Sequence, residues 1–98
     1  MKTAIELIAD ERKRQISYEE WTTAHDDTHH GGEMAVAAAC YALPHLMRRT
    51  TDLIERLWPW EPKWFKPSPA NRTRELVKAG ALIVAEIERL RRISKDIE

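Results

Sequence analysis

Three segments of the chain carry apolar patterns, and two of them lie in its first half. In residues 3–16, Ile5, Ile8 and Ala9 recur at helical spacing among strong helix formers, which predicts a helix of three to four turns. Residues 32–43 are apolar nearly all round and rich in alanine. This pattern is typical of a central helix that its neighbours approach closely.

The third and longest pattern lies near the end of the chain. Its apolar positions are spaced by three, four or seven residues, and they are Leu76, Gly80, Ile83, Ile87 and Leu90. This stripe predicts a helix over residues 70–93, which Ser68 and Pro69 open as a cap and a first-turn proline. A further short helix is predicted over residues 51–57.

Residues 58–69 follow neither a helical nor a strand pattern. They hold three of the four tryptophans and four of the five prolines. Proline excludes a regular helix, and so much aromatic surface is rarely left in contact with water. We therefore expect an all-α fold, a compact bundle of three to four helices with an ordered Trp/Pro-rich loop before the long C-terminal helix. Residues 1–98 would form a single helical domain.

The amino-acid composition excludes some classes of binding partner. Sixteen basic residues balance sixteen acidic ones, so no overall field attracts nucleic acid or a membrane, and no basic helix is available for duplex DNA. The lone Cys40 lies among alanines and is expected to be a small buried side chain. Without a signal segment or a membrane-spanning run, we expect a cytoplasmic protein, and a helical chain this short is expected to form a homo-oligomer.

The second half of the first helix, residues 10–15, is entirely polar. Such a run usually forms a solvated face with local charge pairs. The alternative is that Glu11 and Arg14 point inward, toward a polar site.

The densest group of metal-binding side chains lies in residues 25–33. Nine positions hold three imidazoles and three carboxylates, which are His25, Asp26, Asp27, His29, His30 and Glu33. Imidazole suits zinc, iron, nickel or manganese and carboxylate suits magnesium, calcium or manganese, so this mixture indicates a divalent cation without naming it. The structural alternative is that Asp and Thr cap a helix, the glycines form a turn and the histidines are solvated.

Two neighbouring features extend the hypothesis of a ligand site. Glu33 opens the apolar helix as its lone charge, either as a partner of the helix N-terminus or as a metal ligand. Lys63 and Lys66 alternate with aromatic residues, a pattern that can stack a base and hold a phosphate. A loop clamped by its own tryptophans is the alternative.

Several stretches resemble a family of small proteins encoded by phages and prophages. They are Glu-Arg-Lys-Arg-Gln (11–15), Trp-Thr-x-x-His-Asp-Asp-x-His-x-x-Gly-Glu (21–33), Ala-Ala-Ala-Cys-Tyr-Ala (37–42), Trp-Pro-Trp (58–60), Trp-Phe-Lys-Pro (64–67) and Leu-Val-Lys-Ala-Gly-Ala-Leu-Ile-Val-Ala-Glu-Ile-Glu-Arg-Leu (76–90). The layout is more distantly similar to the MazG-like all-α nucleoside triphosphate pyrophosphohydrolases, which hold magnesium with acidic residues on bundled helices and release pyrophosphate. Glu33 resembles the first acid of the MazG Glu-x-x-Asp step, whereas Val36 stands in place of the second.

This resemblance implies a metal-dependent nucleotide pyrophosphohydrolase. Magnesium or manganese would bridge the phosphates and orient water, held by His25, Asp26, Asp27, His29 and Glu33. Among these, the catalytic residues would be Asp26, Asp27 and Glu33. Glu11 or Glu86 could complete the site, and the nucleotide-binding residues would be Lys63, Lys66, Arg72, Trp60 and Trp64.

Two other hypotheses keep the fold but change the role. Val36 and the aromatic-basic loop favour a non-catalytic phage accessory protein that binds a nucleotide signal or a host protein. In the remaining hypothesis the role is purely structural or oligomeric, and residues 25–33 only cap a helix.

Overall fold

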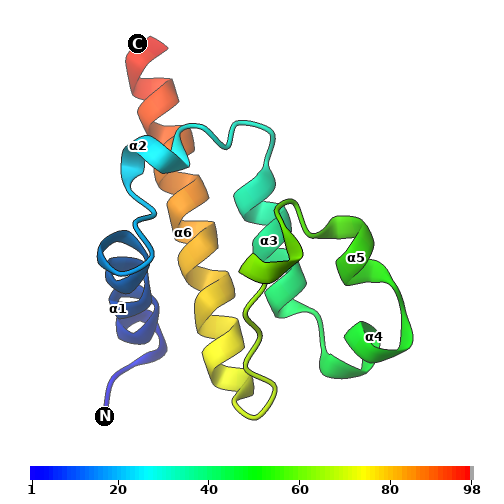
Figure 1. The fold of residues 1–98 in the computed structure, drawn as a ribbon. Helices are drawn as coiled ribbons and strands as arrows, with labels where there is room; N and C mark the ends of the chain where they lie inside the picture. Colours follow the sequence, from blue (N-terminus) through cyan, green and yellow to red (C-terminus); the bar gives the residue numbers. More distant parts are fainter. Residues whose placement is uncertain (98) are drawn as a thin grey trace.

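The computed structural model describes residues 1–97, which fold into six α-helices and one short 3-10 helix, without a strand (Figure 1). The elements are α1 (Ala4–Ser17), α2 (Thr23–Asp26), α3 (Glu33–Ala42), α4 (His45–Thr50), α5 (Leu53–Leu57), η1 (Pro62–Trp64) and α6 (Arg72–Ile97). The expected all-α class is confirmed. Within residues 1–97, none of the helices combines the length and the apolar character that crossing a membrane requires.

The long helix α6 lies between α1 and α3, and the core forms where α6 meets α3 (Figure 1). The buried core residues are Met34, Ala37, Ala38, Tyr41, Ala79, Leu82 and Ala85. Most are alanines, which let the two helix backbones approach closely, as the alanine-rich pattern of α3 predicts. Cys40 is fully buried beside them, as expected.

The apolar stripe that predicts α6 does not form this core. Leu76, Ile83, Ile87 and Leu90 are 48–51% exposed. The spacing therefore locates the helix correctly, but the face that packs against α3 is the one that carries the smaller residues. The stripe residue Gly80 is an exception, because a Cβ there would lie 2.7 Å from Cδ1 of Ile8, so its missing side chain lets α1 pack against α6.

The polar half of α1 is partly buried. Glu11 is 2% exposed, and its carboxylate accepts a hydrogen bond from Arg14 at 2.8 Å and pairs with Arg74 of α6 at 2.6 Å. Burial raises the pKa of Glu11, but Arg14 and Arg74 outweigh it and leave that pKa below its usual value. Of the two interpretations of this segment, the inward one describes Glu11.

Helix α4 forms where the sequence patterns predict no helix, and a buried carboxylate on α6 accounts for its position. Glu75 is 0% exposed. His45 and Arg48 of α4 place their nitrogens 2.8 and 2.7 Å from its Oε1. Arg72 lies 3.2 Å from the same oxygen, and the backbone N–H of Ser68 donates to Oε2 at 2.9 Å. We call these five residues the Glu75 cluster.

The aromatic loop folds over the end of α3. Phe65 and Trp58 contact the ring of Tyr41 at centroid distances of 5.1 and 5.7 Å. The Tyr41 hydroxyl accepts a hydrogen bond from the backbone N–H of Lys66 at 3.0 Å. These contacts hold the loop against the bundle. Within the loop, Trp60 is partly buried and Trp64 is exposed.

Candidate functional site

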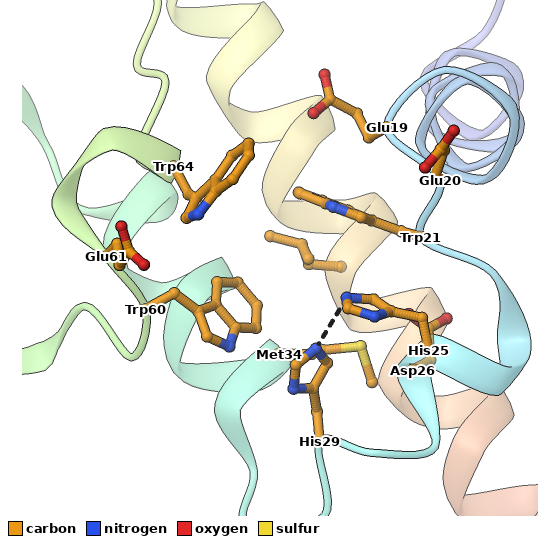
Figure 2. Close-up of a pocket in the computed structure, with 11 residues that line it drawn as sticks. Glu19, Glu20, Trp21, His25, Asp26, His29, Met34, Trp60, Glu61 and Trp64 are labelled. Carbon is orange, nitrogen blue, oxygen red and sulfur yellow. Dashed lines mark hydrogen bonds between the residues drawn. The ribbon is translucent and has the colours of Figure 1, made fainter.

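A pocket of about 460 Å³ lies between the segment that carries α2 and the aromatic loop (Figure 2). Three tryptophans, Trp21, Trp60 and Trp64, line it from the two segments. The other lining residues are Glu19, Glu20, His25, Asp26, His29, Met34, Glu61 and Leu82. A mostly apolar cavity with a few polar groups at its edge is typical of a small-molecule site.

Trp21 reaches the pocket because the segment after α1 is anchored at both ends. The backbone N–H of Trp21 donates to the carbonyl of Gln15 at 2.9 Å. The Thr22 hydroxyl then caps α2 by accepting a hydrogen bond from the N–H of His25 at 3.2 Å. The segment that carries Trp21 therefore supplies one wall of the pocket.

His25 and His29 face each other at the pocket. Their Nε2 atoms are 3.3 Å apart, and the two rings meet edge to face at 88° (Figure 2). The ring of His29 also contacts Trp60, with a centroid distance of 5.0 Å. Burial, and after it the neighbouring imidazole of His25, lower the pKa of His29, so neutral His29 is favoured near neutral pH.

Glu33 lies next to this pair at the start of α3. Its Oε2 is 3.6 Å from Nδ1 of His29. The backbone N–H of Glu33, together with that of Gly31, lowers the pKa of the carboxyl group. A Cβ at Gly31 would lie 2.6 Å from Oε1 of Glu33, and Gly32 has a φ of 83°. The two glycines thus make the turn and leave room for the carboxylate.

The two aspartates of this segment are held by arginines. Asp26 is buried, and its carboxylate accepts a hydrogen bond from Arg12 of α1 at 2.7 Å. Asp27 is exposed, and its carboxylate accepts one from Arg92 of α6 at 2.6 Å. Each aspartate therefore ties α2 to a longer helix. Within residues 1–97, His, Cys, Asp and Glu side chains form no group of three arranged to hold a metal ion.

The two other carboxylates considered for the site have partners elsewhere. Glu11 belongs to the α1 pairs described above. Glu86 accepts a hydrogen bond from Arg89 on the same helix at 2.6 Å, and neither residue lines the pocket.

The residues expected to hold a nucleotide divide into two groups. Trp60 and Trp64 line the pocket, and the ammonium groups of Lys63 and Lys66 lie 5.2 and 5.6 Å from the ring centroid of Trp64. Arg72 lies outside the pocket lining and donates to the carbonyl oxygens at the end of α3 as well as to Glu75. It stabilises a helix C-terminus, where a cation is favoured.

Sequence reasoning missed several lining residues. Trp21 is not among the predicted binding residues, although its position four residues before His25 is a usable signal. Met34 and Leu82 read as ordinary core residues, and Glu19 and Glu20 belong to a segment without a pattern. Nothing in their spacing indicates that they meet the aromatic loop.

Comparisons with protein-family models, with curated proteins and with solved structures found no match for this chain.

Proposed function

We propose that this protein binds a nucleotide, with the base among Trp21, Trp60 and Trp64. The observation that carries the proposal is the presence of three indole rings around one pocket of about 460 Å³. Every base has two π-faces, and stacking on an aromatic side chain contributes roughly 1–3 kcal/mol per base. A pocket walled by indoles suits a planar ring better than a flexible aliphatic ligand.

The polar groups at the rim suit the remainder of a nucleotide. Lys63 and Lys66 lie beside Trp64 and pair with Glu61 and Glu19, which line the pocket. A phosphate can displace these carboxylates and be neutralised by the two ammonium groups. The carboxylates of Glu20 and Glu61, which line the pocket, can accept hydrogen bonds from amino groups of a base. This is the accessory-protein hypothesis of the sequence, in which the ligand is retained rather than converted.

Tryptophan fluorescence tests the proposal directly. The protein is titrated with the ribo- and deoxyribonucleoside triphosphates in buffer containing EDTA, and at least one is expected to quench the emission saturably. Trp64→Ala is the informative variant because this ring is 44% exposed and its loss leaves the core intact. Its affinity should fall about tenfold or more, which corresponds to one lost stacking contact.

Tyr18→Ala is the matched control, since Tyr18 is an exposed aromatic residue outside the pocket lining. Unchanged emission with every nucleotide, or equal losses in the two variants, would contradict the proposal.

The metal-dependent pyrophosphohydrolase is the second candidate. The observation in its favour is that His25 and His29, with Glu33 beside them, border the same pocket as the tryptophans. The ion pairs of Asp26 and Asp27 weigh against a site built on these carboxylates. Release of pyrophosphate from nucleotides with magnesium or manganese tests this candidate. It is abandoned if no nucleotide is hydrolysed and neither ion shifts the melting temperature.

We also propose that the protein forms a homo-oligomer. The half-exposed residues Leu76, Ile83, Ile87 and Leu90 form an apolar stripe along α6, and such a stripe is typically covered by another chain. A second copy of this protein is the partner we propose for it.

A further inference from the structure

We propose that His25 and His29 together bind one divalent transition-metal ion that prefers imidazole ligands, such as zinc, cobalt or nickel. The proposal concerns the ion alone and does not require that a nucleotide binds. It differs from a magnesium or manganese site in both its ligands and its ion.

The spacing of the two imidazoles is the first observation. Their Nε2 atoms are 3.3 Å apart. Two nitrogens that bind one tetrahedral zinc ion at about 2.0–2.1 Å are separated by about 3.3 Å. The observed separation therefore fits one shared ion, which would replace the hydrogen bond that the two rings make without it (Figure 2).

The orientation of His29 is the second observation. The carboxylate of Glu33 lies 3.6 Å from Nδ1 of His29, while Nε2 of the same ring faces His25 (Figure 2). Metal-binding histidines commonly present their other ring N–H to a carboxylate, which fixes the tautomer and orients the ring. Gly31 leaves room for this carboxylate, because a Cβ there would lie 2.6 Å from it.

The chemistry of the neighbouring groups selects the class of ion. Magnesium requires oxygen ligands in near-octahedral geometry, but the carboxylates of Asp26 and Asp27 are paired with Arg12 and Arg92. Two imidazoles instead suit zinc, cobalt, nickel or copper. Since both histidines line the pocket, the remaining coordination positions are open to water or to an oxygen of a bound molecule.

The chain offers its own matched control. His30 is adjacent to His29 but exposed and outside the pocket lining. It tests whether a local excess of imidazole alone, without this geometry, is enough to hold an ion.

Cobalt titration of the untagged, metal-free protein tests the proposal, with visible absorption as the readout of imidazole coordination and zinc as the competitor. His25→Ala and His29→Ala should each weaken cobalt binding by at least about 100-fold, because a direct ligand matters at least as much as an outer partner. Glu33→Gln should weaken it by about 10–100-fold. His30→Ala should bind like the wild type, and excess magnesium should not displace the cobalt.

Three results would overturn the proposal. They are wild-type protein that binds no cobalt, affinity that survives both His25→Ala and His29→Ala, and an equal loss in His30→Ala. Far-UV circular dichroism confirms folding, and His25 is exposed, so at least that variant is expected to keep its structure. Because nucleotide binding is measured separately with EDTA, failure of either proposal is recognised without the other.

Discussion

The Glu75 cluster and the pair His25 and His29 both contain imidazole beside a carboxylate. They differ in how many hydrogen bonds their central groups already make. Glu75 is fully buried, and its two oxygens face donors from His45, Arg48, Arg72 and Ser68. His25 and His29 share one hydrogen bond, His29 also lies 3.6 Å from Glu33, and both rings border an open pocket. A buried carboxylate whose two oxygens are both hydrogen-bonded stabilises the fold, whereas imidazoles that border a pocket can still bind a ligand.

Removing Glu75 should lower the unfolding free energy far more than removing His25. Glu75→Ala leaves buried Arg48 without its carboxylate and should cost about 3–5 kcal/mol of unfolding free energy. His25→Ala removes an exposed side chain and should change the unfolding free energy by less than about 0.5 kcal/mol. Urea unfolding followed by circular dichroism measures both values. Equal losses would mean that the two clusters do not differ in this way.

Low pH should destabilise the Glu75 cluster. Burial opposes ionisation of Glu75, but Arg48, His45 and the N–H of Ser68 outweigh it and lower its pKa to about 2. Since the folded pKa lies below the ordinary value of about 4.5, Glu75 contributes stability that is complete above pH 4.5 and is lost as pH falls through 2.

The wild type should therefore lose up to about 3 kcal/mol more than Glu75→Gln between pH 5 and pH 2. Parallel pH profiles of the unfolding free energy for the two proteins would contradict this role of Glu75.

Two adjacent aspartates allow a finer comparison within the segment of the histidine pair. Asp26→Asn breaks a buried pair with Arg12, which keeps Glu88 as a second partner at 3.1 Å. We expect a cost of about 2 kcal/mol, below the roughly 3–5 kcal/mol for a buried ion that loses its only partner. Asp27→Asn breaks an exposed pair and should cost less than about 1 kcal/mol. Thermal melting of the two variants measures this difference. If either aspartate were a metal ligand, its substitution would lower the affinity for cobalt instead.

Substitutions on the exposed stripe of α6 should change stability as little as His25→Ala does. Ile87 is 50% exposed, so Ile87→Lys should change the unfolding free energy of a monomer by less than about 0.5 kcal/mol. In sedimentation velocity, the wild type should nevertheless be an oligomer and Ile87→Lys a monomer. Ala35→Lys, at an exposed residue of α3, is the control for added charge. A wild type that is monomeric at high concentration would exclude the proposed oligomer.

The sequence predicted the helical class because α3 and α6 carry strong local patterns. It missed α4 because that helix is positioned by the bonds of His45 and Arg48 to Glu75, which lies about thirty residues away. The pattern in α6 located the helix but not its buried face, since alanine contributes little to apolar periodicity. Close packing of Ala79 and Ala85 against α3 decides that face.

The candidate site was partly accessible from the sequence for a similar reason. The concentration of imidazoles and carboxylates in residues 25–33 identified the segment, and the aromatic loop was recognised as a second contributor. The arginine partners of Asp26 and Asp27 lie on α1 and α6, up to 65 residues away. Sequence spacing cannot reveal such pairs, so it could not separate structural aspartates from the groups that face the pocket.

The contacts of Arg72 have a consequence for cleavage of the backbone. Its guanidinium binds the last carbonyl oxygens of α3, and Glu75, one turn later, binds α4. The exposed junction at Thr51 and Asp52 lies between these partners along the chain. A protease cut there would leave two fragments still joined through α3, α4 and α6. Limited proteolysis should thus give a nicked protein that elutes as one species and separates only in denaturant.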